Sequence, residues 1–220
     1  MIVPMPGRHI VDSLRLAASG CVRADSPFAR TLIRARIYLS TRGSIPNHDR
    51  STAEVEQLMA QAGYAVAAFR DGGVWHCDAL PSGVLHDLGV LLSALRSQPP
   101  EGGPFVVACV DDEFFLIARS HGPRIDLLLS DLTASVEFPL AAQVLERLGE
   151  DPPEDDELDE VWPIGELDLF SDLELGEDEM ESILDDLDAY PEEMLDTVLD
   201  RIGLEDEFAR ARTAAGRVPS

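Results

Sequence analysis

The chain has 220 residues, of which 45% are hydrophobic, and carries a formal net charge of −25 at pH 7. This length and apolar content suffice for one or two packed domains, which excludes a wholly disordered or fibrous protein. The charge disfavours direct binding of nucleic acid and of anionic membrane surfaces, because contacts with phosphate need Arg and Lys on one face.

Basic residues concentrate at the N-terminus. Residues 1–52 hold eight Arg against three acidic residues, a net charge of +5, and scattered Pro and Gly predict that 1–58 form a disordered basic extension. Three interpretations are open: a targeting peptide, a basic arm that folds back on the acidic part of the chain, or an over-extended gene start. We favour the third, because Met59 stands just before the first predicted strand.

Residues 59–149 predict an α+β domain that opens with a hairpin. Strand-like runs at 64–70 and 74–80 flank an Asp-Gly-Gly segment. An Asp-Gly pair between such runs predicts a tight turn, because both central turn positions need positive φ. Apolar residues recurring at helical spacing over 84–95 then predict one amphipathic helix.

The rest of this domain contains three further strand-like runs and a closing helix. The runs 105–110 and 113–118 meet at an Asp-Asp turn, and 124–129 follows a Gly-Pro turn. A helix near 138–148 is expected to hold Pro139 in its first turn. The resulting order ββαβββα predicts a small, mainly antiparallel sheet with helices packed on one face.

An acidic region follows the predicted domain. Of the chain's 42 acidic residues, 26 lie between Glu150 and Glu207, where the single basic residue is Arg201. Residues 150–165 are too charged and Pro-rich to pack, which predicts an acidic linker. An acidic helical region is expected over 166–212.

Two apolar stripes organise the acidic helical region. The apolar residues of 180–187 recur at helical spacing. A second apolar stripe over 194–202 follows Pro191 and ends at Gly203. They predict a short C-terminal helical hairpin whose other face is nearly all carboxylate. Residues 213–220 are expected to form a disordered tail.

Cysteine usage and hydropathy predict a cytoplasmic protein. Cys21, Cys77 and Cys109 stand at wide spacings, and the latter two lie in apolar strand-like runs that are typical of buried, reduced thiols. No window approaches the run of about 18 apolar residues that spans a bilayer, and the N-terminus lacks the apolar segment of a secretory signal.

The pattern of elements resembles a known bacterial family. The segment from Gly63 to Trp75, the strand pair 105–118 with its acidic turn, the Leu-Leu-Leu-Ser-Asp segment at 127–131, and an acidic linker before 173–207 together are similar to tRNA adenosine deaminase-associated proteins. The likeness covers about 59–212. It implies gene neighbourhood with the deaminase that makes inosine in the tRNA anticodon, and it brings no functional residues.

The chemistry of that deaminase is missing from this sequence. Zinc-dependent base deamination needs an H-x-E pair and a downstream P-C-x-x-C. The nearest counterpart is the H-x-D of His76 and Asp78, and no C-x-x-C occurs. The scattered His and Cys residues indicate core packing and exposed side chains and not a metal site. The acidic residues at 111–113 are typical of a solvated turn. The carboxylate run at 185–193 lacks the glycine of a calcium-binding loop and indicates solvated surface. We therefore predict no catalytic residue, no cofactor and no metal, and hence not an enzyme.

The acidic region is instead predicted to bind a basic protein, such as the tRNA adenosine deaminase. A solitary aromatic among carboxylates anchors a segment either on the chain's own sheet or on a partner, and both options are open for Trp162. The candidate partner-binding residues are Trp162, Asp185, Asp186, Asp188, Glu192, Glu193 and Asp196. The sequence does not fix the oligomeric state.

Three functional hypotheses follow. The favoured one is a noncatalytic adaptor or regulator whose acidic face meets the basic tRNA-binding surface of the deaminase. The second is a nucleic-acid mimic or inhibitor-like protein that acts on another basic enzyme. The third is an enzyme with an unrecognised site, which requires a concave pocket with converging polar groups.

Overall fold

A computed structural model describes residues 63–153, 161–186 and 188–215. The predicted basic extension over 1–58, part of the predicted linker (154–160), Leu187 of the first apolar stripe, and 216–220 of the predicted tail lie outside the described residues. All described residues fall in one compact unit, Gln57–Ser220.

Within the described residues, six strands form one antiparallel sheet in the order β2-β1-β3-β4-β5-β6. The strands are β1 (Gly63–Asp71), β2 (Val74–Ala79), β3 (Phe105–Val110), β4 (Phe114–His121), β5 (Arg124–Leu129) and β6 (Ile164–Gly165). The predicted α+β class and the order ββαβββα are confirmed. The short β6 comes from the end of the predicted linker, where Gly165 pairs with Leu128.

Two tight turns show why these strands pair in this register. Gly72 and Gly73 join β1 to β2 with φ of 60° and 81°, as the Asp-Gly-Gly segment predicts. Asp111 and Asp112 join β3 to β4 with φ of 51° and 56°, and Glu113 N donates to Val110 O at 2.9 Å. Aspartate tolerates this left-handed conformation better than most residues, so it replaces glycine here.

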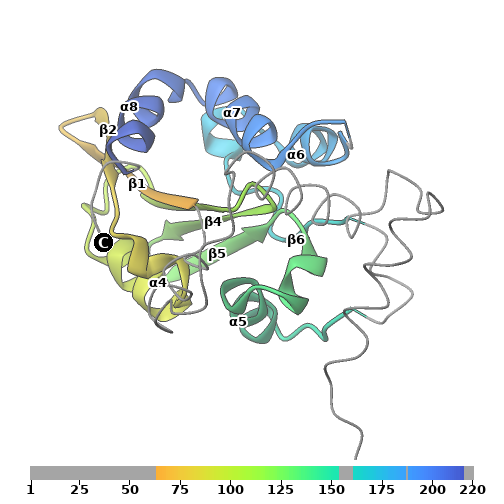
Figure 1. The fold of residues 1–220 in the computed structure, drawn as a ribbon. Helices are drawn as coiled ribbons and strands as arrows, with labels where there is room; N and C mark the ends of the chain where they lie inside the picture. The colour runs from red at the N-terminus through yellow and green to blue at the C-terminus, as the bar shows by residue number, and fades with distance from the viewer. Residues whose placement is uncertain (1–62, 154–160, 187, 216–220) are drawn as a thin grey trace, which may run out of the picture. The chain divides into compact units, whose positions relative to one another are not determined.

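One face of the sheet is covered by helices from the predicted domain (Figure 1). They are η1 (Ser82–Leu85), α4 (Leu88–Arg96), η2 (Leu132–Val136) and α5 (Pro139–Leu148). The prediction of one continuous helix over 84–95 is wrong. Asp87 has extended backbone angles and its carboxylate accepts a hydrogen bond from Val90 N at 3.0 Å, so it ends the first turn and caps α4.

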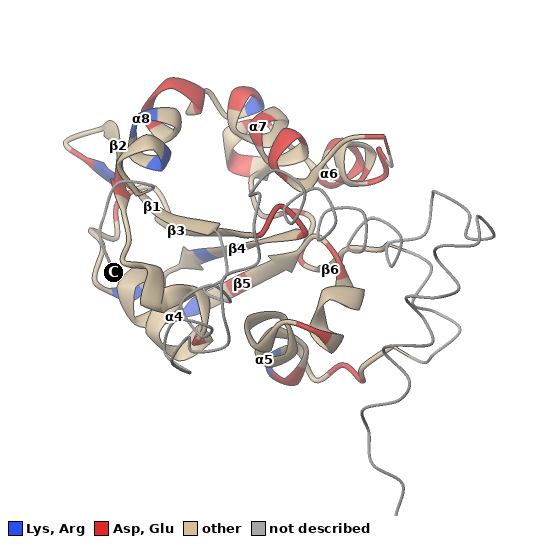
Figure 2. Cartoon of the chain, viewed as in Figure 1, with Lys and Arg blue, Asp and Glu red and all other residues tan. Residues whose placement is uncertain are grey.

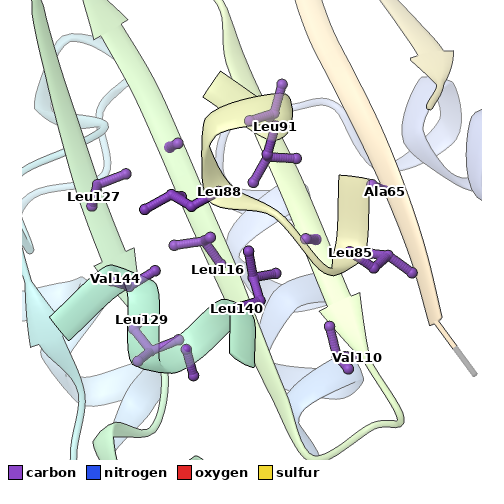
Figure 3. Packing of buried hydrophobic residues seen from close by; sticks show 14 of the residues in the cluster. Ala65, Leu85, Leu88, Leu91, Val110, Leu116, Leu127, Leu129, Leu140 and Val144 are labelled. Carbon is purple, nitrogen blue, oxygen red and sulfur yellow. The ribbon is translucent and has the colours of Figure 1, made fainter. Parts of the chain in front are cut away.

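The first core lies between this face and these helices. Figure 3 shows Leu88 and Leu91 of α4 and Leu140 and Val144 of α5 pointing toward apolar side chains of the strands, among them Leu116. Non-polar burial on this scale is the main favourable term in folding.

The opposite face is covered by the acidic region (Figure 1). Its helices are η3 (Ser171–Leu173), α6 (Glu177–Leu184), α7 (Pro191–Arg201) and α8 (Glu205–Ala215). The helices of the predicted domain thus lie on one face, as expected, and the acidic region covers the other, so the sheet lies between two helical layers. The predicted hairpin is present as α6 and α7, whereas α8 continues into 213–215, where a disordered tail was expected.

Strand β3 shows the physical reason for two helical layers. Every residue from Phe105 to Val110 is buried. Because successive side chains point to opposite faces, Val106, Ala108 and Val110 enter the first core, while Phe105, Val107 and Cys109 enter a second core with α6, α7 and α8. A strand that is apolar on both faces needs cover on both.

A buried arginine fastens the acidic region to the sheet. Arg119 of β4 is 0% exposed and forms a bidentate ion pair with Asp172 at 2.6 and 2.8 Å. Its other N–H groups donate to the carbonyl oxygens of Leu169, Gly102 and Gly103, and its guanidinium lies 5.1 Å from the centre of the Phe170 ring. All five donors of the guanidinium thus have acceptors, which is what makes burial of this charge tolerable.

Candidate partner-binding site

Among the described residues, an open acidic hollow lies where α7, α8 and the β3–β4 turn meet. It encloses about 540 Å³ and is lined by Asp112, Tyr190, Glu192, Glu193, Asp196 and Arg212. We call these six residues the acidic hollow. Its four carboxylates and one guanidinium give a formal charge of −3.

The start of α7 places two of these carboxylates. Pro191 occupies the first helical position, where its missing N–H costs nothing, and Tyr190 precedes it as the cap residue. Glu193 Oε2 accepts a hydrogen bond from Tyr190 N at 2.9 Å, which is one half of a capping box. Glu192 and Glu193 therefore lie in the first turn, where the helix dipole favours negative charge.

The β3–β4 turn supplies the third side of the hollow. Asp112 Oδ1 accepts a hydrogen bond from Glu192 N at 3.2 Å, which joins the turn to the first turn of α7. The two residues are 80 positions apart in the sequence. The contact helps to satisfy a backbone N–H that has no partner within the helix.

Arg212 closes the hollow from α8. Its Nη1 lies 3.0 Å from Glu192 Oε1 and 2.9 Å from Asp196 Oδ1, and its guanidinium lies 5.8 Å from the centre of the Tyr64 ring. Partial burial by itself lowers the pKa of Arg212, but the interactions with Tyr64, Asp196 and Glu192 outweigh it and raise that pKa. The arginine is thus a fixed cation that holds α7 and α8 together.

Tyr64, whose ring lies near the Arg212 guanidinium, and the buried Cys109 are neutral at physiological pH. Tyr64 and Cys109 are partners across β1 and β3. Burial, followed by the charges of Glu192 and Asp112, raises the pKa of Cys109 to about 12, and burial raises the pKa of Tyr64 as well. A thiol with so high a pKa is a poor nucleophile, so Cys109 is not an activated sulfur.

The structure brings together three of the seven predicted partner-binding residues. Glu192, Glu193 and Asp196 line the hollow. Asp185, at the C-cap of α6, and the nearby Asp186 and Asp188 are exposed in the α6–α7 connection and do not line it. Figure 2 shows acidic residues gathered over α6, α7 and the start of α8.

Trp162 lies elsewhere. Its half-buried side chain packs against the first core, and its carbonyl oxygen accepts a hydrogen bond from Leu132 N at 2.9 Å. Of the two interpretations that the sequence left open, this position favours anchoring on the chain's own sheet. The contact also holds the strand β6 segment beside η2.

Sequence reasoning missed three residues of the hollow: Asp112, Tyr190 and Arg212. Asp112 was interpreted only as part of a solvated turn. One signal for Arg212 was available, because it is one of the few cations near a stretch of carboxylates and must find a partner among them. No local pattern connects Asp112 to α7.

The described residues contain neither a cluster of metal-ligating side chains nor a membrane-spanning helix. No group of three or more His, Cys, Asp or Glu side chains among them is arranged to hold a metal ion. In the same part of the chain, no helix is long and apolar enough to cross a membrane.

Comparison with known proteins shows the family of this chain. Residues 63–205 match the family described as Rv3753c-like tRNA adenosine deaminase-associated protein. The chain belongs to this family. It is also 36% identical over 156 residues to "Protein Rv3753c" of Mycobacterium tuberculosis, an alignment that covers 70% of this chain and 90% of the relative. No solved structure matches.

The extent of the family match agrees with the architecture of this deaminase-associated protein. It runs from the first residue of β1 to the first residue of α8, so it includes both the sheet and most of the acidic helical layer. Helices α6 and α7 of this chain thus lie within the matched residues. The resemblance noted from the sequence alone is confirmed.

Proposed function

We propose that this protein is a noncatalytic adaptor or regulator that binds the tRNA-modifying adenosine deaminase through the acidic hollow. Membership in a family described as deaminase-associated supports the choice of partner. The single observation that carries the choice of surface is the convergence of Asp112, Glu192, Glu193 and Asp196 on one open hollow.

Electrostatics supports a basic partner. A deaminase that holds tRNA presents cations to phosphate, and the hollow offers carboxylates to the same kind of surface. Complementary charge raises the association rate and makes affinity depend on salt. The exposed Asp185, Asp186 and Asp188 extend the negative surface beside α7.

Tyr190 supplies an aromatic contact at the same place. Its side chain is 53% exposed and lines the hollow beside the carboxylates. Tyrosine is enriched among residues that dominate interface energy, and its ring attracts a guanidinium or ammonium group. An arginine or lysine of the deaminase is therefore expected to lie against Tyr190 and pair with the nearby carboxylates.

The test removes charge while keeping hydrogen-bond acceptors. A triple variant, Glu192→Gln, Glu193→Gln and Asp196→Asn, keeps an acceptor for Tyr190 N and for Arg212 but loses three negative charges. We expect its affinity for the deaminase of the same organism to fall at least about tenfold in calorimetric titration.

The matched control removes three charges elsewhere. Glu137, Glu146 and Glu150 are exposed at or beside α5, in the opposite helical layer, and their change to Gln leaves the hollow intact. The control is expected to bind within about twofold of the unmodified protein. Equal loss in both variants would show that net charge, and not the hollow, determines binding.

The carboxylates of the hollow also fit the second candidate, a nucleic-acid mimic that acts on another basic enzyme. Both functions predict competition with nucleic acid at the partner's surface. Partner identity separates them: saturable binding of the deaminase supports the adaptor, whereas absence of deaminase binding with intact folding supports the mimic.

A further inference from the structure

Strand β2 is the exposed edge of the sheet. Among the described residues it pairs with β1 alone, over Val74–Ala79. Leu80 N donates to Ala65 O at 2.8 Å, and bonded pairs alternate along an antiparallel ladder. Residues 74, 76, 78 and 80 therefore direct their backbone groups toward β1, and Trp75, Cys77 and Ala79 direct theirs outward.

This edge lacks three of the features by which sheets prevent edge-to-edge pairing. Such protection comes from very short edge strands, from Lys or Pro, and from bulges. β2 has six residues in an unbroken register, and Asp78 is its single carboxylate. The edge at the other end of the sheet is protected, since β6 has two residues and Arg124 and Glu166 flank it.

The segment 74–80, Val-Trp-His-Cys-Asp-Ala-Leu, is complementary to itself in antiparallel orientation. With a twofold axis at Cys77, His76 faces Asp78 of the second copy, and Asp78 faces its His76. Trp75 faces the small Ala79, and Val74, which is 60% exposed, faces Leu80. Hydrogen-bonding polar pairs and large–small pairs directly across two strands stabilise a sheet.

The same register also matches the backbone. Trp75, Cys77 and Ala79 are the outward-facing positions, and the axis at Cys77 pairs them with one another. Each such pair in an antiparallel ladder exchanges two N–H to C=O bonds. Three pairs thus satisfy every outward backbone group of β2.

Charge beside the edge permits close approach of two acidic molecules. Helix α8 carries Glu207 and Arg210 near Cys77. Besides burial, which raises the pKa of that thiol most, Glu207 raises this pKa and Arg210 lowers it, and the two side chains form an ion pair at 2.7 Å. The acidic hollow, in contrast, adjoins the first residues of β1, on the far side of Tyr64. The Glu207–Arg210 pair therefore adds no net charge on α8 beside β2.

We propose that the β2 edge binds a second copy of this chain, so that two sheets join as one continuous antiparallel sheet about a twofold axis at Cys77. This arrangement is isologous, uses the same surface of both copies, and leaves both acidic hollows accessible. It does not depend on the deaminase being the partner of the hollow.

The test is sedimentation equilibrium of the full chain with a charge swap. We expect a monomer–dimer equilibrium, and His76→Asp is expected to weaken dimerisation about tenfold because it places Asp against Asp across both pairs. The double variant His76→Asp with Asp78→His restores two His–Asp pairs across the strands and is expected to return the constant to within about twofold. His86→Asp, the same change at the exposed C-cap of η1, should have no effect.

Hydrogen exchange locates the contact. The amides of Trp75, Cys77 and Ala79 are expected to exchange more slowly as concentration rises, since those groups become hydrogen-bonded. A monomer at every concentration up to about 1 mM, or a dimer whose charge-swap variant stays as weak as His76→Asp, would overturn the proposal. Protection of these amides only when another protein is added would overturn it too, and would identify a different occupant of the edge.

Discussion

Arg119 is the residue on which the attachment of the acidic layer most depends. It is buried and donates hydrogen bonds to one carboxylate and three carbonyl oxygens. The carboxylate and one carbonyl lie 53 and 50 positions later in the sequence, and the other two carbonyls lie 16 and 17 positions earlier. Loss of the guanidinium leaves those carbonyls without a donor in the interior, which is costlier than the bonds themselves are stabilising.

We predict that Arg119→Lys lowers the free energy of unfolding by about 3 kcal/mol, because an ammonium group cannot reach five acceptors in the geometry of a guanidinium. Urea unfolding followed by circular dichroism measures this. Arg210→Lys is the control, since Arg210 is exposed on α8, and it is expected to change stability by less than about 0.5 kcal/mol. Equal effects would contradict the role assigned to Arg119.

Asp172 gives a pH dependence of known sign. Partial burial raises the pKa of its carboxyl, but the hydrogen bonds and charge of Arg119 outweigh burial and hold that pKa below its ordinary value. A lowered pKa in the folded state means that the stabilisation is fully present above the unfolded pKa of about 4 and is lost as pH falls through the folded value.

We therefore predict that the stability difference between the unmodified protein and Asp172→Asn is constant from about pH 5 to 7 and shrinks below about pH 4. Comparing two proteins cancels the common effect of the other carboxylates, whose mutual repulsion also changes with pH. Unfolding curves over this range check it. A difference that grows as pH falls would contradict the sign.

At the scale of elements, the acidic helices are a structural layer and not an appendage. Leu195, Val198 and Leu199 of α7 and Phe208 of α8 are buried at 1% exposure or less in the second core. Figure 2 shows acidic positions along these helices, and Glu193, Asp200, Glu205 and Asp206 among them are exposed. High charge and deep packing thus coexist on the same amphipathic segments.

We predict that Phe208→Ala lowers the free energy of unfolding by about 3–5 kcal/mol, as large-to-small changes in a core do. Leu91→Ala in α4, in the opposite layer, is expected to cost about 2–5 kcal/mol, so both layers should matter to a similar degree. Thermal and urea unfolding measure both. An effect of Phe208→Ala below about 1 kcal/mol would show that α8 does not pack as described.

The strands were predictable because their signals are local. Alternation, an Asp-Gly turn and Gly-Pro punctuation lie within a few residues of each other, and the predicted strands agree with β1 to β5. The break at Asp87 was missed because the apolar spacing continues across it while a single capping side chain decides the helix start. The apolar stripe of α8 consists of Leu204, just before the helix, and of Phe208 and Ala211. It was missed because it is short and charged residues surround it.

The second helical layer and the hollow required long-range contacts. Six consecutive buried residues in β3 do indicate cover on both faces, but they do not say which segment supplies it. The carboxylates of α7 were found from charge alone. Their contacts with Asp112 and Arg212 were not, because a hydrogen bond across 80 positions follows from the register of strands and helices together.

At the scale of the whole molecule, which has a net charge of −25, the acidic region is at once a negative surface and the cover of the second core. The acidic layer cannot be deleted to test its role in binding, because removal of 161–215 would expose the second core, including Phe105, Phe115 and Ile117. We predict that a chain ending at Pro153 is insoluble or binds hydrophobic dyes, whereas the amide variants of the hollow remain folded. Solubility and dye fluorescence check this, and a folded, soluble truncation would contradict the two-layer description.

The central claim is that a deaminase-associated protein meets its partner by charge at the acidic hollow. The most direct measurement is the dissociation constant of the full chain with the tRNA adenosine deaminase of the same organism, at about 50 and about 300 mM NaCl. The account predicts binding at low salt that weakens at least about tenfold at high salt, with less salt dependence after amide substitution of Glu192, Glu193 and Asp196. No binding at either salt, or an affinity that is the same at both, would contradict it.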